Sequence, residues 1–221
     1  MISLSLAIAL LIGTVLMAVP VLLQSRWYHV AVWKALVSTV FLTIAGTAGT
    51  YALFFVENQR LGGISFYGAV FLVPILFILV AWLLRLPYGT LMDLCAPAEC
   101  VMLAFMKTQC MMTGCCGGKV IGTTAAGNPI VFPSQIAELI NGLLLAAILM
   151  FLGHRRPNRK DLYPLYMVLY GCTRFVLNFL REQQSDFFLG MSPGNVWSIV
   201  SVLAGGAWLW ILYYREKANQ R

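Results

Sequence analysis

The residues best suited to chemistry lie inside apolar segments, where ionisable side chains are costly. Tyr170, Arg174, Asn178 and Arg181 follow one another at spacings of 4, 4 and 3. These spacings place the four side chains on one stripe of a helix. Arg174 lies too deep for its guanidinium to reach the membrane surface. A planar, always charged group at that depth suits a phosphate or carboxylate ligand, or a buried acid as a structural partner.

A second apolar segment carries three ionisable residues, Asp93, Glu99 and Lys107. Asp93 and Lys107 are 14 residues apart, about 21 Å along a helix, so they share a face without contact. We expect Asp93 near one end of the helix, where it could cap the start. Lys107 should lie near the other end, in contact with a lipid head group or simply with water.

The connection 113–133 and the segment after it add a third group of polar residues. GCCGGK at 114–119 lets backbone amides approach an anion, although a flexible turn has the same composition. Pro133, Ser134 and Gln135 are typical of a helix start. Glu138 then falls inside an apolar helix, where it is the expected partner of an intramembrane Arg. Two or three cations, one buried acid and several hydroxyl or amide groups would suit an anionic lipid head group.

The elements that must position these residues are membrane helices. The chain is 60% hydrophobic and 10% charged, whereas a soluble domain carries about 25% charged residues. Apolar runs near the roughly 20 residues of a membrane span cover 2–23, 30–55, 66–84, 91–112, 132–152, 163–180 and 195–214. The first has no cleavage pattern and is expected to remain as a helix. No barrel-type alternation is present, so the sequence predicts an all-α integral membrane protein, a single bundle of about seven transmembrane helices over 1–221.

The basic residues predict the orientation of the bundle. The formal net charge of +7 is concentrated in loops, which does not favour nucleic acid as a partner. With the N-terminus outside, the inner loops and tail hold Arg26, Lys34, Arg85, Arg155, Arg156, Arg159, Lys160, Arg215, Lys217 and Arg221, and the outer loops hold Arg60, Lys119 and Arg181. The positive-inside rule therefore predicts an outer N-terminus and a cytoplasmic C-terminus.

Six cysteines do not form a disulfide scaffold in this pattern. Cys95, Cys100 and Cys172 lie in apolar segments, where Cys acts as a small hydrophobe. Three more, Cys110, Cys115 and Cys116, fall near the outer face, where a bridge involving Cys110 or a redox role for the vicinal pair stays open. No CxxC pair exists, so the spacing does not favour zinc or thioredoxin-type chemistry, and we expect no metal.

Four motifs resemble those of the prolipoprotein diacylglyceryl transferase family of bacterial inner membranes. GGISFYG at 62–68 is similar to the family's GG-x-S-F-H-G, and DLCAP at 93–97 with Lys107 and Gly114 is similar to its D-x-x-A-P…R…N-G. FPSQIAE at 132–138 resembles H-P-S-Q-x-x-E, and YGCTRF at 170–175 with Arg181 resembles Y-G-x-x-R-F…R. The resemblance covers a core of 62–214, leaving divergent N-terminal helices at 1–61 and a basic tail at 215–221.

The resemblance implies seven helices in this orientation, in the bacterial cytoplasmic (inner) membrane. It also implies transfer of the diacylglyceryl group of phosphatidylglycerol, or of another anionic phospholipid, to the lipobox Cys thiol of a preprolipoprotein. Glycerol phosphate leaves, and no cofactor or metal is needed. The catalytic candidates are Arg174, Tyr67 and Glu138. The substrate-binding candidates are Lys107, Gln135, Ser134, Tyr170, Arg181, Gly114 and Asn178.

The sequence departs from the family pattern at several of these positions. Tyr67 stands where the family has His, and a phenol of pKa about 10 is a poor base at neutral pH. Lys107 stands for Arg, keeping the charge without the planar fork. Cys110 stands for an Asn and Asn178 for an acid. The two histidines of the chain fall in the expected cytoplasmic loops and cannot replace the missing one.

Two other functions remain open from the sequence. A protein of this fold that has lost the His could bind lipid without turning it over. A small transporter could use Arg174 and Glu138 as an ion pair, although the internal repeat typical of transporters is not evident.

Overall fold

A computed structural model of the 221-residue chain describes residues 4–60, 62–124, 127–157, 159–182, 187–188 and 190–219. Within these ranges the chain forms seven helices and one two-stranded hairpin. In chain order they are α1 (Leu4–Trp27), α2 (Val32–Asn58), α3 (Tyr67–Leu84), α4 (Tyr88–Thr113), β1 (Val120–Thr123), β2 (Pro129–Val131), α5 (Ser134–Arg155), α6 (Leu162–Phe179) and α7 (Pro193–Asn219). The all-α bundle predicted from the sequence is confirmed.

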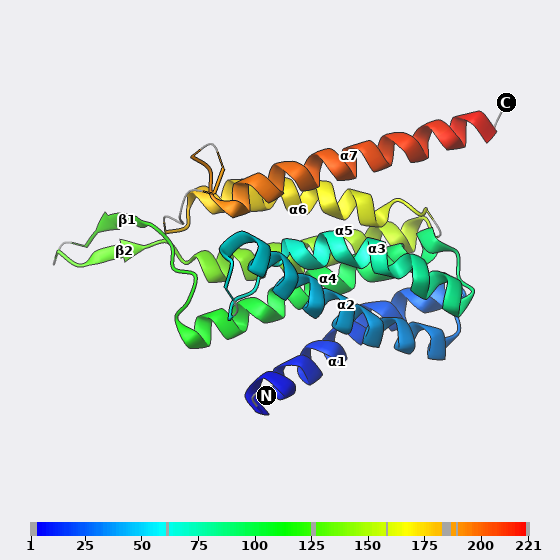
Figure 1. Ribbon diagram of the computed structural model, residues 1–221, viewed down its shortest axis with the longest axis horizontal. Coiled ribbons are helices and arrows are strands. Elements are labelled where there is room, and N and C mark those ends of the chain that lie inside the picture. The colour runs from blue at the N-terminus through cyan, green and yellow to red at the C-terminus, as the bar shows by residue number, and fades with distance from the viewer. Residues whose placement is uncertain are drawn as a thin grey trace.

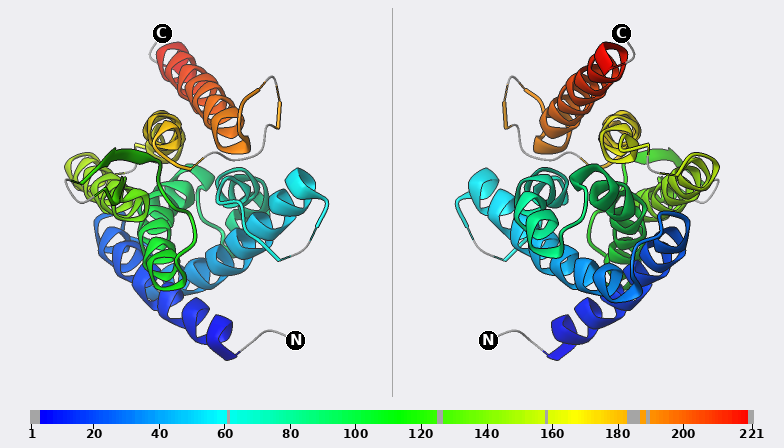
Figure 2. Two further views of the ribbon diagram at one scale, coloured as in Figure 1. Left: turned by 90° about the vertical axis from the view of Figure 1, so that its left-hand side faces the viewer. Right: turned by 90° about the vertical axis from the view of Figure 1, so that its right-hand side faces the viewer.

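Six of the described helices, all except α6, are long and apolar enough to cross a membrane. The central helix is α4, which contacts α1, α2, α3, α5 and α6. Figure 1 shows the helices lying along the long axis of the molecule, and Figure 2 shows α7 at the periphery beside α6. Because α4 is the most enclosed of the six, its polar residues must find partners inside the protein rather than in water.

Two glycines allow α2 and α3 to approach more closely than other residues would permit. A Cβ atom built on Gly68 would lie 1.9 Å from the carbonyl oxygen of Gly49, and one on Gly49 would lie 2.3 Å from that of Gly68. Each backbone thus occupies the space that the other's side chain would need. This contact holds the start of α3, including Tyr67, against α2.

The hairpin of β1 and β2 was not expected from the sequence, which suggested only a connection here. The strands are antiparallel, with Val120 opposite Val131, and they extend beyond the helices at one end of the bundle (Figure 1). Alternation is too short in strands of four and three residues to give a sequence signal.

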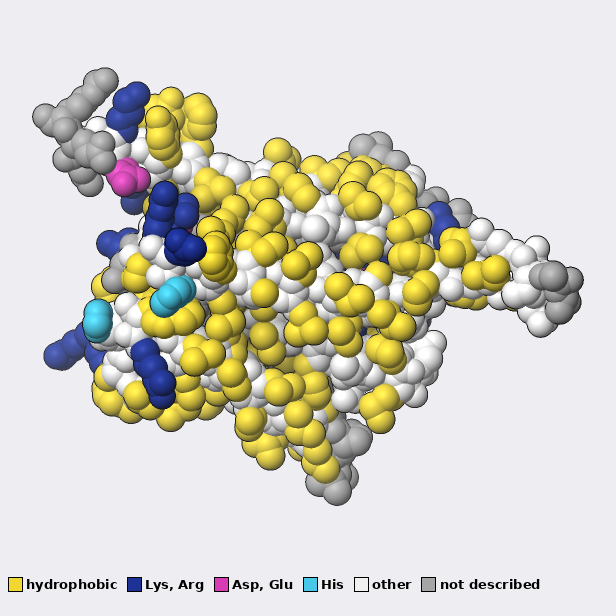
Figure 3. Space-filling model, turned by 180° about the vertical axis from the view of Figure 1, so that it is seen from behind, with side chains coloured by type: hydrophobic (Ala, Val, Ile, Leu, Met, Phe, Trp, Pro, Cys, Tyr) yellow, Lys and Arg dark blue, Asp and Glu magenta, His cyan; other side chains and the backbone are white. Residues whose placement is uncertain are grey.

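Charge is distributed unequally between the two ends of the bundle. Figure 3 shows apolar side chains over most of this face and most of its Lys and Arg side chains at one end, the end opposite the hairpin. This is the pattern expected of a multi-pass membrane protein.

Asp93 acts at this basic end, but not as a cap on its own helix, as the sequence suggested. It lies in the second turn of α4 and accepts hydrogen bonds from the backbone N–H groups of Lys160, at 2.7 Å, and Leu162, at 3.0 Å. The Tyr28 hydroxyl donates a third bond at 3.4 Å. Since Leu162 begins α6, Asp93 caps α6 and anchors it to the central helix.

Candidate functional site

A buried carboxylate surrounded by three cations forms the centre of the site. Glu138 of α5 forms ion pairs with Lys107, whose Nζ lies 2.6 Å from Oε2, and with Arg174, whose Nη1 lies 2.5 Å from Oε1. Arg181 Nε lies 3.6 Å from the same Oε1. None of the four residues is more than 9% exposed. The expected pairing of Glu138 with an intramembrane Arg is therefore present, and Lys107 and Arg181 join it.

The formal charges of this cluster do not cancel. Lys107 and Arg174 face a single carboxylate, that of Glu138, which leaves a net charge of +1 (2 − 1) among these three buried side chains. Burying uncompensated charge is expensive, and a single acid offsets only part of the cost. An anion placed beside the cluster would supply the missing negative charge.

A polar cavity of about 380 Å³ opens beside the cluster. Its walls include Lys107, Glu138, Tyr170, Arg174 and Arg181 from the predicted site. The other wall residues come from α2, the connection between α2 and α3, α3, α4, the 114–119 loop and the start of α7. Long cation side chains thus converge from α4, α6 and the segment after α6 on one enclosed space. Such an arrangement suits an anionic group such as a phosphate.

The stripe predicted on the sixth helix is present with one change. Tyr170, Arg174 and Asn178 are buried on α6, but the helix ends at Phe179. Arg181 lies beyond that end, where its backbone forms an isolated bridge with Gly118. The prediction that Arg181 continues the helix was wrong. The bridge nevertheless directs its side chain to Glu138, because it fixes the chain next to the 114–119 loop.

Tyr67 lines the polar cavity, but its hydroxyl is hydrogen-bonded to Ser198. The Tyr67 Oη and Ser198 Oγ atoms are 2.7 Å apart, and the Ser198 hydroxyl lies 2.6 Å from the Gly194 carbonyl oxygen. Ser198 has one proton and gives it to that carbonyl, so Tyr67 donates its own proton to Ser198. A phenol held in this way orients groups around it and is not placed to act as a base.

Three of the predicted binding residues instead shape the neighbouring loop. Ser134 Oγ donates to the carbonyl of Cys116 at 2.6 Å, and Gln135 Nε2 donates to that of Cys115 at 2.7 Å. Gly114 ends α4 with φ +68°, a left-handed conformation that Gly adopts without strain. The three residues position the loop, and none of them lines the polar cavity among the residues described.

Asn178 also lies outside the cavity wall in the described structure. Its Nδ2 donates to Ser192 Oγ at 2.5 Å and to Asn195 Oδ1 at 2.9 Å. Asn178 therefore joins the end of α6 to the beginning of α7. Its position next to Gly194 gives it a role in the placement of α7 rather than direct contact with the cavity.

One acid on the cavity wall was missed by sequence reasoning. Glu57 lies in the last turn of α2 and accepts a hydrogen bond from Ser65 Oγ at 2.7 Å. No Lys or Arg forms an ion pair with it within the described part of the chain. It lies two residues beyond the apolar run 30–55 and was not considered in the sequence analysis. The available signal was Ser65 in the 62–68 motif, which lies eight residues later.

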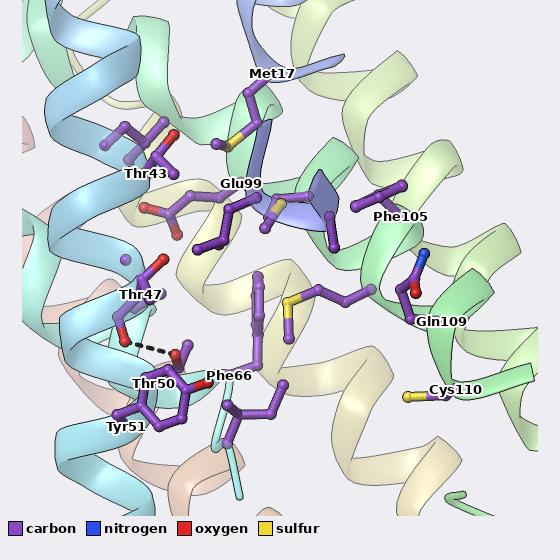
Figure 4. A pocket seen from close by; sticks show the side chains of 18 of the residues that line it. Met17, Thr43, Thr47, Thr50, Tyr51, Phe66, Glu99, Phe105, Gln109 and Cys110 are labelled. Atoms are coloured by element: carbon purple, nitrogen blue, oxygen red, sulfur yellow. Dashed lines mark hydrogen bonds between the residues drawn. The ribbon is translucent and has the colours of Figure 1, made fainter. Parts of the chain in front are cut away.

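A second, apolar cavity of about 480 Å³ lies next to the polar one, between α1, α2 and α4. Ile64, Phe66, Met106 and Cys110 belong to the walls of both cavities. Figure 4 shows Met17, Phe66 and Phe105 around the apolar space, with Cys110 at its edge. A polar, cationic space beside an apolar one matches the two parts of a phospholipid, its phosphate and its acyl chains.

These observations define the class of the protein: a multi-pass α-helical membrane protein with a buried cationic cavity adjoining an apolar one. The chain belongs to the prolipoprotein diacylglyceryl transferase family, whose model matches residues 1–211. The match extends further toward the N-terminus than the four motifs, which begin at Gly62.

Two relatives illustrate the degree of similarity. The phosphatidylglycerol–prolipoprotein diacylglyceryl transferase of Francisella tularensis subsp. novicida (strain U112) is 28% identical over 170 residues, which are 72% of this chain and 63% of that protein. The enzyme of the same name from Teredinibacter turnerae (strain ATCC 39867 / T7901) is 28% identical over 172 residues, 71% of this chain and 60% of the relative. The chain thus spans less than two thirds of the length of either relative.

Proposed function

We propose that this protein transfers the diacylglyceryl group of phosphatidylglycerol to the lipobox cysteine thiol of a preprolipoprotein. The observation that carries the proposal is the positive charge of Lys107 and Arg174, which Glu138 offsets only in part, on the wall of the polar cavity. Family membership supports the same reaction. The substrates are those in the names of the two relatives.

In the proposed reaction the cations act on the phosphate. Arg174, Lys107 and Arg181 hold the phosphate, and the acyl chains extend into the apolar cavity. The acceptor sulfur forms a bond to the terminal glyceryl carbon while the bond from that carbon to the phosphate oxygen breaks. Glycerol phosphate leaves with the electron pair, and the cations stabilise the charge that develops on it.

The acceptor thiol must lose its proton, because the thiolate is the nucleophile. Three nearby cations stabilise the ionised form of Glu138, so this carboxylate is a weak acceptor for the thiol proton. Glu57 is the other carboxylate on the polar cavity wall among the described residues, and Ser65 orients it. We assign proton acceptance to Glu57, with Tyr67 orienting the reacting groups.

The wall of the polar cavity includes Cys116, four residues before β1, so the cavity lies at the end of the bundle that carries the hairpin. Figures 1 and 3 show that the basic end is the opposite one. By the positive-inside rule the hairpin end faces away from the cytoplasm. The proposed setting is therefore the outer leaflet of the bacterial inner membrane, where exported preprolipoproteins arrive.

The test is a transfer assay with purified protein, phosphatidylglycerol vesicles and a lipobox peptide, followed by mass spectrometry of the peptide. Arg174→Ala should lower the rate by at least about 100-fold, the scale seen when one transition-state donor is removed.

Glu57→Gln should also reduce the rate, with little change in lipid binding. Arg215→Ala is the matched control, since Arg215 is exposed near the end of α7 and should leave the rate unchanged. Full activity in a well-accumulated Arg174→Ala protein would sink the proposal.

A second function is favoured by Tyr67, which stands where the family motif has His and donates its proton to Ser198. The chain would then bind anionic lipid in the same cavity without turnover. Lipid binding that requires Arg174, together with turnover that appears only in Tyr67→His, would establish this function in place of the first.

A further inference from the structure

Three cysteines converge where the two cavities meet. Cys110 comes from the last turn of α4, and Cys115 and Cys116 come from the loop that follows. Their sulfur atoms all lie within 4.8 Å of one another, and all three thiols are free. Cys110 lines both cavities, Cys116 lines the polar one and Cys115 the apolar one. The bundle thus brings three sulfur atoms, which are soft metal ligands, close together. None of them has a role in the proposed transfer reaction.

The surrounding residues hold this loop in a defined shape. Ser134 and Gln135 fix the carbonyl groups of Cys116 and Cys115 from the start of α5. The Thr113 hydroxyl lies 3.0 Å from the Gln109 carbonyl oxygen and 3.4 Å from the sulfur of Cys115. Cys116 itself has φ +61°, a left-handed conformation that costs a residue with a side chain roughly 1–2 kcal/mol. Strain of this kind persists where the surroundings impose it, often at ligand sites.

We propose that Cys110, Cys115 and Cys116 bind a thiophilic d10 cation, Zn(II) or Cu(I), as three thiolates. Sulfur atoms around tetrahedral zinc, with Zn–S near 2.3 Å, are separated by about 3.8 Å. Small rotations about the side-chain bonds would close the three thiols from within 4.8 Å to that spacing. Thiolate ligands select such soft or borderline ions over Mg(II) or Ca(II).

The charges around the three thiols favour a bound metal–thiolate centre. Three thiolates around Zn(II) carry a net charge of −1, and around Cu(I) a net charge of −2. Lys107 and Arg181 act electrostatically on Cys116 and would offset that negative charge. The sequence predicted no metal because no CxxC pair is present. The third ligand comes instead from the helix, five residues before the vicinal pair.

A metal–thiolate site accounts for all three cysteines, whereas a disulfide would use two and leave the third unexplained. The bound ion would also fix the 114–119 loop to the end of α4. It would place negative charge near Lys107 and Arg181, the cations that the phosphate site uses.

The experiment uses the full-length protein in detergent, reduced and then freed of reductant. Cd(II) serves as the optical probe of thiolate ligation through its charge-transfer absorption. Zn(II) and Cu(I) are then titrated separately against chelators selective for each ion, which distinguishes the two. We expect one ion per chain. Cys116→Ser should lower the affinity by more than about 100-fold, because changes even outside the direct ligands of a metal cost 10–100-fold.

The matched control is Cys172→Ser, which removes an exposed thiol on α6 away from the cluster and should bind like the parent. Three results would overturn the proposal: no charge-transfer band in the parent, the same affinity in Cys116→Ser, or equal loss in the Cys172→Ser control. A protein that loses two hydrogens in air and binds no metal after reduction would also overturn it, in favour of a disulfide. None of these metal-binding and mass measurements depends on transferase activity, so they test the metal site separately from the proposed function.

Discussion

At the scale of single residues, the most unusual chemistry belongs to the Cys116 thiol. A hydrogen bond from the neighbouring Cys110 thiol lowers the pKa of Cys116 to about 5, with Lys107 and Arg181 acting in the same direction against the effect of burial. An ordinary cysteine has a pKa of about 8.5. Cys116 is thus a thiolate at neutral pH, the form that reacts with electrophiles.

This pKa predicts an unusual alkylation profile for metal-free protein. Since the pKa is lowered, the thiolate is fully present above about pH 6 and is lost as the pH falls through about 5. The rate of Cys116 modification by iodoacetamide, followed by peptide mass spectrometry, should stay flat from pH 8 to 6 and then fall. Cys110→Ala removes the main cause and should move the profile to higher pH. A midpoint near pH 8 in the parent would contradict the prediction.

Residue types in the sequence were sufficient to identify most of the central cluster, but not every role. Arg174, Lys107 and Glu138 stand out because charge inside an apolar run demands a partner, and the structure brings them together. Ser134 and Gln135 were expected to contact substrate, but their donors point to loop carbonyls. The direction in which a polar side chain points depends on tertiary packing and is not encoded in spacing along one helix.

At the scale of elements, the contact between α2 and α3 is the most restrictive in the bundle. A methyl group on Gly68 would collide with the backbone of Gly49, which cannot move as a side chain would. Gly68→Ala should therefore destabilise the protein by about 1–3 kcal/mol, the usual cost of overpacking. The apparent melting temperature in detergent should fall.

Gly206→Ala is the control for this prediction. Gly206 lies on the exposed side of α7, and an added Cβ would meet nothing within 4 Å. Because Ala favours a helix over Gly by up to about 1 kcal/mol, this variant should melt at the same temperature or higher. Equal losses in both variants would show that the Gly49–Gly68 contact has no special importance.

The helices were foreseeable because long apolar runs have few alternatives in a membrane. The residues at which each helix begins and ends were harder to predict from the sequence. The sequence placed Arg181 on the sixth helix, yet α6 ends at Phe179 and the chain turns to form a bridge with Gly118. That ending depends on the 114–119 loop, which lies more than 60 residues earlier in the chain. The hairpin and the cysteine cluster likewise depend on contacts that no local pattern records.

At the scale of the whole molecule, the unequal distribution of basic residues predicts the orientation in the membrane. Thr123 is exposed on β1, and Arg156 is exposed at the C-terminal end of α5, the end away from the hairpin. In intact cells, a membrane-impermeant maleimide should label a Thr123→Cys variant at position 123. It should label an Arg156→Cys variant at position 156 only after the membrane is permeabilised. The reverse pattern would show that the bundle is inserted the other way.

The apolar cavity beside the cation cluster has a further consequence for the cell. Its volume of about 480 Å³ is finite, and its walls are formed by α1, α2 and α4 together with residues at the start of α3. A space of fixed size accepts some hydrocarbon chains more readily than others. If the proposed reaction holds, the fatty acids found on mature lipoproteins would be a selected sample of those in the membrane, chosen by length before any protein is modified.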